Sequence, residues 1–166
     1  MSDRVSVRQA EPAEYAMVGE LTVLAYRADG LAADDNGYAT SLRNAAGRAV
    51  AAELWVGELD GSVAGSVTFC PPGSPYRQLA GPDEGEFRML AVEPEARGRG
   101  VGRALVLKCF DRSRELGLGA IVLCSLPSMR AAHALYGSLG FARDPGLDWE
   151  PTPGVPLLGF RATLPL

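Results

Sequence analysis

The chain has 166 residues, a length typical of one globular domain, so we expect a single domain over residues 1–166. Hydrophobic residues make up 47% and charged residues 22% of the chain, which argues against global disorder, and the formal net charge of −4 argues against a surface built for nucleic acid. No apolar run reaches the ~18 residues of a membrane helix, and no signal-peptide segment opens the sequence. We therefore expect a cytoplasmic protein without a nucleic-acid or membrane partner.

The cysteines predict neither a disulfide framework nor a metal site. Cys70, Cys109 and Cys124 are odd in number and form no Cys-x-x-Cys pair, so we expect reduced thiols, mostly in the core. The only histidine, His133, has no clustered Cys or Asp partners, so no metal is predicted.

The first part of the chain predicts one strand followed by two helices. Residues 5–8 alternate apolar and polar side chains, as a half-buried strand does. Glu11-Pro12 suits the start of a helix, whose apolar residues continue at helical spacing to Ala25. After a polar break at residues 31–37, we expect a second helix from Tyr38 to about Ala51.

The middle of the chain predicts three strands. Residues 54–59 and 62–69 flank the turn dipeptide Asp60-Gly61 and predict a hairpin. Pro71-Pro72 ends the second of these strands, and a long loop follows over residues 71–85. Residues 86–92 predict the third strand.

Helices and strands alternate in the second half. A glycine-rich run precedes a helix whose inward side chains are Leu105, Val106, Cys109, Phe110 and Leu116. The apolar residues 120–124 predict a buried parallel strand, and Pro127-Ser128 starts a helix that ends at Gly140. Strands at 141–143 and 157–163 flank a Pro/Gly-rich connection over 144–156. This order predicts an α/β fold with a mixed sheet of about seven strands, flanked by about four helices on both faces.

A strand, a turn, closely spaced glycines and a helix form an anion-binding geometry, because the first turn of a helix leaves backbone N–H groups unpaired. Arg97, Arg99 and Arg103 add guanidinium groups that pair well with phosphate. The run does not match the dinucleotide fingerprint, because Arg103 or Leu105 takes the last glycine position, and no Gly-Lys-Ser or Gly-Lys-Thr of a P-loop follows. We expect a diphosphate-bearing ligand.

Three stretches together resemble the GNAT superfamily of acyl-CoA-dependent N-acyltransferases: Leu90-Ala91-Val92-x-Pro94, Arg97-Gly98-Arg99-Gly100-Val101-Gly102-Arg103-Ala104-Leu105 and Ala132-x-x-Leu135-Tyr136-x-x-Leu139-Gly140-Phe141. The resemblance covers the element order of nearly the whole chain. It implies a splayed sheet and acetyl-CoA, or another acyl-CoA, as donor. The pantetheine arm would lie against Leu90, Ala91 and Val92, and the pyrophosphate on the turn formed by Arg97, Gly98, Arg99, Gly100, Val101, Gly102 and Arg103.

An amine acceptor must lose a proton before it attacks a thioester, and a carboxylate can act as the general base. By resemblance Glu86 takes this role; the alternatives are a solvated glutamate beside a loop, or Asp83 or Glu84 in its place. The developing oxyanion needs a preorganised donor, which the resemblance places at a backbone N–H near Leu90 or Ala91.

Tyr136 matches the family's general acid, which protonates the departing thiolate; the alternative is a helix tyrosine packed with its apolar neighbours. The family commonly carries asparagine seven residues earlier, where this chain has Met129. His133 and Ser125 have two interpretations each, as groups near the cleft or as ordinary packing and strand-end residues.

By resemblance the acceptor pocket would draw on the first helices, the loop over residues 71–85 and the connection over 144–156. These regions carry Tyr26, Asp34, Asp35, Tyr38, Asp148, Trp149 and Glu150. Carboxylates beside aromatic rings would suit a cationic amine, although solvated loop acids explain the same residues. The sequence thus predicts transfer of an acetyl group from acetyl-CoA to a primary amine of a small molecule or protein. The alternative is a non-catalytic acyl-CoA-binding module, and a homodimer stays open.

Overall fold

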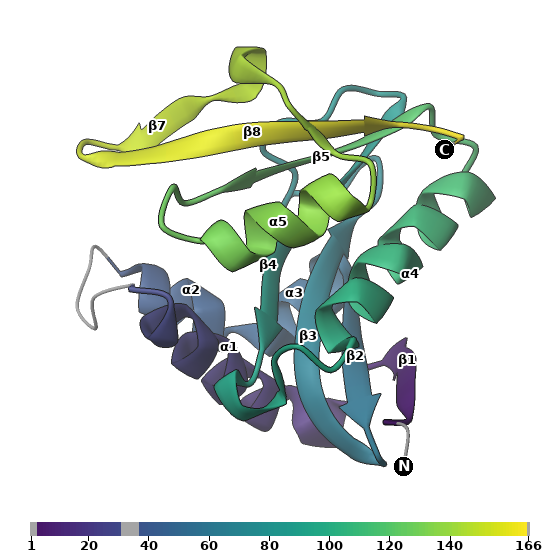
Figure 1. Ribbon diagram of the computed structural model, residues 1–166, viewed down its shortest axis with the longest axis vertical. Coiled ribbons are helices and arrows are strands. Elements are labelled where there is room, and N and C mark those ends of the chain that lie inside the picture. The colour runs from purple at the N-terminus through teal and green to yellow at the C-terminus, as the bar shows by residue number, and fades with distance from the viewer. Residues whose placement is uncertain (1–2, 31–36, 166) are drawn as a thin grey trace.

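The computed structural model describes residues 3–30 and 37–165, which fold into one twisted sheet with helices on both faces (Figure 1). The strands are β1 (Val5–Gln9), β2 (Glu53–Leu59), β3 (Ser62–Cys70), β4 (Glu84–Val92), β5 (Ala120–Ser125), β6 (Ala142–Arg143), β7 (Trp149–Thr152) and β8 (Val155–Thr163). The helices are α1 (Tyr15–Ala28), α2 (Tyr38–Arg43), α3 (Ala45–Ala51), α4 (Val101–Glu115) and α5 (Arg130–Ser138). Short 3₁₀ turns lie at Pro12–Glu14, Pro94–Ala96 and Pro145–Leu147.

The sheet is mixed. Its strand order is β1-β2-β3-β4-β5-β8-β6, and β7 pairs with β8 outside this path. All neighbours are antiparallel except β4 and β5, which are parallel because α4 crosses over between them. The predicted α/β class and mixed sheet are confirmed, with one strand and one helix more than expected among the described residues.

The parallel pair separates soon after it forms. Only residues 84–86 of β4 lie opposite residues 120–122 of β5. β4 then continues to Val92 without β5, while β5 stays paired with β8 as far as Ser125. In Figure 1, β4 runs down the molecule whereas β5 and β8 run across its top. The sheet is therefore splayed, as the resemblance implied, and the opening faces the N-terminal end of α5.

A β-bulge in β4 lies at this opening. The register shifts between Ser66 and Thr68 of β3, where β4 has an extra residue, and Met89 takes a positive φ of 56°. Strict alternation would place Phe87 and Met89 on one face, but Phe87 packs beneath α4 and Met89 packs against α1 and α2. The bulge thus turns the backbone of Met89 and Leu90 toward the gap between β4 and β5.

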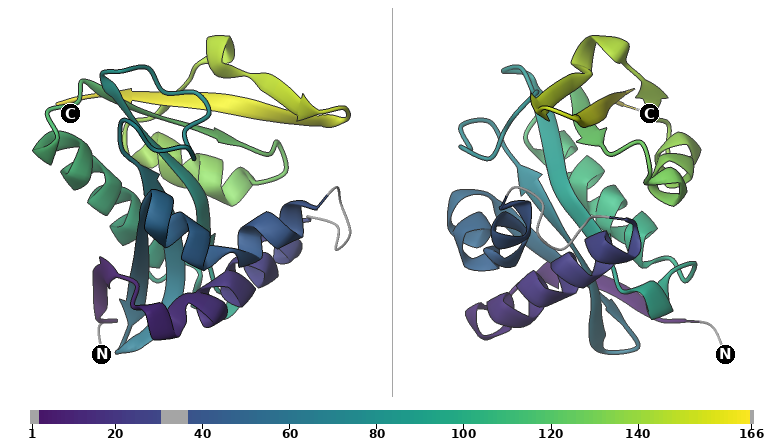
Figure 2. Two further views of the ribbon diagram at one scale, coloured as in Figure 1. Left: turned by 180° about the vertical axis from the view of Figure 1, so that it is seen from behind. Right: turned by 90° about the vertical axis from the view of Figure 1, so that its left-hand side faces the viewer.

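Helices α1 to α3 cover one face of the sheet, and α4 and α5 cover the other (Figure 2). Fully buried Val18 and Leu42 belong to clusters on the first face. Phe110 and Leu105 of α4 pack on the second face with Tyr136 of α5. Each side of β4 therefore has its own apolar core, which fixes the position of this strand between the two helical layers.

Two paired glycines let α4 lie close to the sheet. A Cβ on Gly57 or Gly65 would approach Val101 Cγ1 within 2.8 or 2.9 Å, and both positions lie opposite each other on β2 and β3. Side chains there would push the first turn of α4 away from the strands. The two glycines thus set the distance between the first turn of α4 and strands β2 and β3.

The predicted helix from Tyr38 to about Ala51 is two helices. At Asn44 the backbone leaves the helical region, and the Asn44 side chain accepts a hydrogen bond from the Gly47 N–H at 3.0 Å. Asparagine competes with the helical backbone in this way and favours the N-cap. The chain therefore breaks between α2 and α3.

Three other expectations differ from the structure. The connection over 144–156 contains the strand β7, which pairs with β8. The last helix begins at Arg130 rather than at Pro127-Ser128, after a short turn. Leu116, expected to face inward, is 43% exposed because it follows the last turn of α4.

Candidate active site

The N-terminal turn of α4 presents backbone N–H groups without protein acceptors. Gly100 precedes the helix in the left-handed region with φ of 93°, and no side chain caps it. Within residues 3–30 and 37–165, the N–H groups of Val101, Gly102 and Arg103 have no protein acceptor. A first helical turn with open amides carries partial positive charge and is suited to phosphate.

These amides border a cavity of about 410 Å³, here called the turn cavity. It is lined by nine of the ten residues predicted to contact the donor, namely Leu90, Ala91, Val92, Arg97, Gly98, Gly100, Val101, Gly102 and Arg103. Arg99 does not line it. Its guanidinium pairs with Asp3, with an Nη2–Oδ1 distance of 2.6 Å, on the side of β1.

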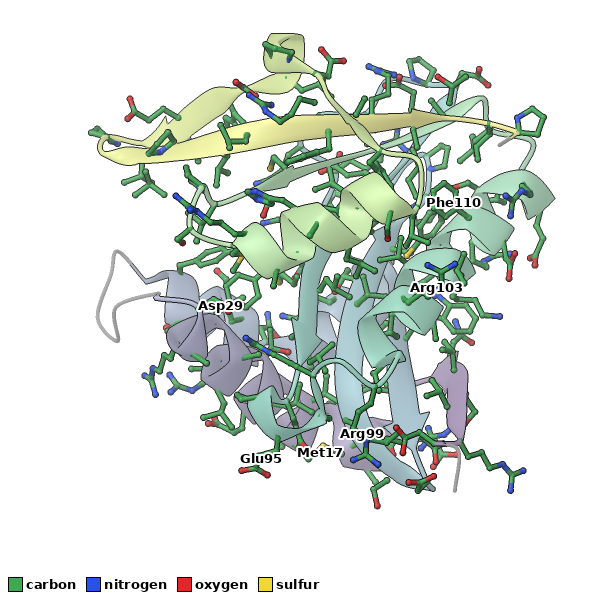
Figure 3. All side chains as sticks on the ribbon, in the orientation of Figure 1. Met17, Asp29, Glu95, Arg99, Arg103 and Phe110 are labelled. Atoms are coloured by element: carbon green, nitrogen blue, oxygen red, sulfur yellow. The ribbon has the colours of Figure 1, made fainter. Side chains whose placement is uncertain are left out.

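The arginines of the turn have different partners. Arg97 pairs with Asp29 at 2.7 Å and donates to the Ala25 carbonyl at 3.1 Å, which ties the turn to the end of α1. Arg103 is exposed, lines the turn cavity and has no ion pair with any described residue. Figure 3 shows Arg99 and Arg103 well separated. Arg103 is therefore the guanidinium available to a phosphate.

A second cavity of about 560 Å³, here called the fork cavity, lies where β4 and β5 separate. Asp29, Leu90, Met129 and Ala132 line both cavities, which makes them neighbours. The fork cavity holds aromatic and polar side chains from α1, α2, β4, β5 and α5, and the β7–β8 hairpin forms part of its rim. The two cavities therefore adjoin each other beside Leu90 of β4.

Tyr136 is buried beside the fork cavity. It is 4% exposed and its ring packs edge-on against Phe87, Phe141 and Phe160, with centroids 5.8 Å from each. It lines the fork cavity, and no described residue forms a hydrogen bond with its hydroxyl. Burial raises the pKa of the phenol well above its usual value, so the group stays protonated and can donate.

The splayed strands, the bulge and the open helix turn lie in a segment that matches a known protein family. The model of the acetyltransferase (GNAT) family matches residues 20–141. The chain belongs to this family. The match runs from within α1 to just past the end of α5 and includes all the lining residues of the turn cavity, while the part of the fork cavity formed by the β7–β8 hairpin lies beyond it.

Curated relatives with similar segments are longer than this chain. Mycothiol acetyltransferase of Nocardia farcinica is 41% identical over 61 residues, which are 37% of this chain and 20% of that protein. N-acetyltransferase family 8 member 3 of Rattus norvegicus is 33% identical over 90 residues, 54% of this chain and 38% of that protein. The chain matches about a fifth of the length of the mycothiol acetyltransferase, so this similarity covers one segment of it.

Solved GNAT structures share the fold over almost their full length. An acetyltransferase of the GNAT family from Staphylococcus aureus Mu50 has a TM-score of 0.74 at 14% identity, covering 97% of this chain and 99% of that one. The structure of yncA from Salmonella typhimurium, with its cofactor acetyl-CoA, has a TM-score of 0.70 at 23% identity, covering 98% and 95%. A GCN5-related N-acetyltransferase from Kribbella flavida has a TM-score of 0.69 at 26% identity, covering 96% and 98%.

Glu86, the predicted base of this GNAT protein, is fully buried and has backbone partners. Its carboxylate accepts hydrogen bonds from the N–H groups of Gln78, Leu79 and Ala80 at 2.9 to 3.1 Å. Glu86 does not line the fork cavity, whereas Gln78 does. The carboxylate holds the preceding loop in place. It affects the fork cavity indirectly, through Gln78 of that loop.

Glu86→Gln is expected to lower the free energy of unfolding by about 2 kcal/mol, because the new amide would point a donor at N–H groups that need acceptors. For a domain of this size that corresponds to roughly 4–8 °C in Tm. Thermal unfolding followed by circular dichroism measures it, with exposed Glu95→Gln as the control (Figure 3). An unchanged Tm together with a large loss of turnover would instead favour the direct-base role.

Ser125 and His133 form a pair that the sequence did not single out as a site. His133 Nε2 lies 3.1 Å from Ser125 Oγ, and Ser125 lines the fork cavity at the end of β5. Burial lowers the pKa of the imidazole; its hydrogen bond to the Leu126 backbone acts in the opposite direction, and nearby Arg143 lowers the pKa further. The ring is therefore neutral near pH 7 and can accept a proton.

The residues expected in the acceptor pocket divide into three groups. Tyr26 and Tyr38 line the fork cavity. Asp148, Trp149 and Glu150 do not line it, and Asp148 pairs with Arg143 at 2.8 Å, which with the Gly159 N–H lowers the Asp148 pKa to about 2. Asp34 and Asp35 lie outside the described residues.

Gln78, Arg88 and Cys124 also line the fork cavity, and they were not among the site residues predicted from the sequence. Arg88 belongs to the predicted strand β4, where alternation alone does not identify which side chain meets a cavity. Cys124 is half-buried, and Cys70 and Cys109 are buried, all three as free thiols.

No helix among the described residues is long and apolar enough to cross a membrane. Among the same residues, no three His, Cys, Asp or Glu side chains gather closely enough to hold a metal ion.

Proposed function

We propose that this chain, as one catalytic domain, transfers an acetyl group from acetyl-CoA to a primary amine by direct attack of the amine on the thioester. The observation that carries the proposal is that the two cavities adjoin beside Leu90 of β4. Nine residues predicted to contact the donor line one cavity, and Tyr136 lines the other. The acetyl-CoA in the structure of Salmonella yncA supports the choice of donor.

The chain offers each part of an acyl-CoA a matching environment. The open amides of the α4 turn and Arg103 suit the diphosphate. The apolar side chains of Leu90 and Val92, together with Ala132 and Leu135 of α5, line the turn cavity and suit the pantetheine arm. The bulge at Met89 and Leu90 then places the thioester near the fork cavity.

Two groups would act on the reacting atoms. As negative charge develops on the carbonyl oxygen, a backbone N–H at Leu90 or Ala91 stabilises it, since the bulge interrupts the regular pairing of β4 with β3 there. Tyr136 gives its proton to the departing sulfur; after the thiol leaves, the phenolate takes up a proton from solvent, because burial favours the protonated form.

The amine also loses a proton, and the Ser125–His133 pair is placed to take it. Ser125 lines the fork cavity, and its Oγ lies 3.1 Å from His133 Nε2 and 3.7 Å from Met129 Sδ, so a proton can pass from the amine through the hydroxyl to His133 once the hydroxyl turns from the sulfur to the ring. His133 lies one helical turn from Tyr136, with ring centroids 6.5 Å apart. In this proposal Glu86 is a positioning residue that fixes the loop carrying Gln78.

His133→Asn is expected to lower kcat by about 100-fold, the lower range for loss of one general base. Because burial lowers the His133 pKa below its usual 6.5, wild-type kcat should fall only below that pH, as the ring becomes protonated. The variant should lack this acidic limb. A pH–rate profile measures both effects, and Gly137→Ala on the same helix, where a Cβ meets open space, is the control. An unchanged limb would exclude His133 as the base.

The proposed function is tested by thiol release from acetyl-CoA across a panel of primary amines, with binding of acetyl-CoA measured separately by calorimetry. We expect binding, and amine-dependent release for at least one acceptor class. Binding without release for any amine would favour a non-catalytic acyl-CoA-binding module. Absence of binding would overturn the proposal.

A further inference from the structure

Two tyrosines and an arginine form the wall of the fork cavity on the side of α1 and α2. The rings of Tyr26 and Tyr38 meet edge-on with centroids 6.1 Å apart, and both line the cavity. Arg88 reaches this wall from β4, and its charge partly offsets the rise that burial causes in the pKa of the Tyr38 phenol. The Arg88 guanidinium lies 6.0 Å from the Tyr76 ring centroid and donates one hydrogen bond, to the Tyr76 carbonyl at 3.3 Å. Most of its five donors remain available.

A second guanidinium lies behind this wall. Arg48 of α3 is 1% exposed and donates from Nη1 to the carbonyls of Ser41 and Leu42, while its Nε has no partner among the described residues. Burial lowers the pKa of the Arg48 guanidinium, and the charge of Arg88 adds to this effect. The two cations are therefore close enough to influence each other.

No described carboxylate compensates these two charges. Neither Arg88 nor Arg48 forms an ion pair within residues 3–30 and 37–165. Glu86 directs its oxygens at loop amides, and Asp29 pairs with Arg97 at the other end of the cavity. A poorly solvated cation gains most from an anion that can accept several of its hydrogen bonds. The wall is thus suited to an anionic group, in contrast to the acidic pocket expected from the sequence.

We propose that the acceptor is an amine that also carries a carboxylate, with the carboxylate bound by Arg88 and the Tyr38 hydroxyl. This inference rests on the proposed function and names the substrate class of the same site. Arg88 lies two residues from Leu90 across the bulge, at most about 7 Å of backbone, so an amine a few bonds from the bound carboxylate reaches the thioester position. The rest of the acceptor meets an apolar rim formed by Leu126, Pro127, Pro151, Val155, Pro156 and Leu157. Free α-amino acids with apolar side chains have this combination of groups.

Binding of the acetylated products tests this class without depending on turnover. With CoA present, calorimetry compares the N-acetyl derivatives of L-leucine, L-methionine and L-phenylalanine with the corresponding N-acetyl amides. We expect at least one acid to bind at least 10-fold more tightly than its amide, since the amide lacks the charge that Arg88 recognises. Equal affinities, or no binding of any acid, would overturn the inference.

Two variants assign the effect to Arg88. Arg88→Gln is expected to remove the preference for the acid, and Arg88→Lys to retain part of it, because lysine keeps the charge without the two-pronged geometry. Arg114→Gln, on the exposed face of α4, is the control and should change nothing. Unchanged affinity of each variant for acetyl-CoA shows that the fold is intact. A preference that survives Arg88→Gln would overturn the role of Arg88.

Kinetics with free L-leucine, L-leucinamide and 3-methylbutylamine separate this inference from the proposed function. Amino-acid turnover at least 10-fold above that of the other two, by kcat/KM, supports both. Turnover of all three at similar kcat/KM supports the acetyltransferase and overturns the carboxylate class. Acid-selective binding without any thiol release supports the carboxylate site and overturns the acetyltransferase.

Discussion

Tyr136→Phe is expected to lower kcat by about 100-fold or more, while the Kd for acetyl-CoA changes less than about 3-fold. The substitution removes only the hydroxyl. The ring keeps its contacts with Phe87, Phe141 and Phe160, so the core beneath α5 is preserved. Because the sulfur then leaves without a proton from the protein, the loss falls on the chemical step. Steady-state kinetics and calorimetry measure the two quantities.

The expected pH dependence follows from the burial of the phenol. Burial raises the Tyr136 pKa, so the phenol stays protonated at a pH where an exposed tyrosine would ionise. Any loss of kcat at alkaline pH that comes from ionisation of Tyr136 should therefore begin above the pH at which an exposed tyrosine ionises. Tyr15→Phe is the matched control, because Tyr15 packs near α3 and lines neither cavity. If Tyr136→Phe retained wild-type kcat, the hydroxyl would have no part in proton transfer.

Arg103→Glu is expected to weaken acetyl-CoA binding by on the order of 100-fold, because it replaces an attraction for the diphosphate by a repulsion; each is worth about 1–2 kcal/mol near a solvated surface. Arg99→Glu provides the control four residues earlier on the same turn. Arg99 faces Asp3 and Asp60 rather than the turn cavity, so its reversal should change the Kd less than about 3-fold.

The effect of Arg103→Glu on acetyl-CoA binding should also depend on ionic strength. The difference between wild type and Arg103→Glu should shrink as salt rises, since screening weakens both attraction and repulsion at an exposed site. Calorimetry at low and high salt measures it. Equal effects of the two substitutions would mean that general charge near the turn, rather than the position of Arg103 on the cavity, governs binding.

The sequence predicted the parts of the site that depend on local signals. Closely spaced glycines predict the turn, helical spacing of apolar residues predicts α4, and a short apolar run predicts β5. Each of these signals lies within a short segment, and the structure has all three elements. The break at Asn44 also has a local signal, an N-cap residue before Gly47, but the alanine-rich pattern on both sides concealed it. β7 lacks such a signal, because Pro151 interrupts a strand of only four residues.

The features that the sequence did not predict depend on contacts between distant segments. The bulge at Met89 puts a non-glycine residue at positive φ, which only the packing of two helical layers against β4 explains. The resemblance assigns Glu86 the role of general base, which stays a prediction, and the loop that surrounds its carboxylate is set by tertiary structure. The Ser125–His133 contact joins β5 to α5 in the same way.

The most direct test of the account is a crystal structure of the chain with acetyl-CoA. The account places the diphosphate against the N–H groups of Val101, Gly102 and Arg103, with the thioester between Leu90 and the Tyr136 hydroxyl. A ligand bound elsewhere, or a thioester directed away from Tyr136, would contradict it.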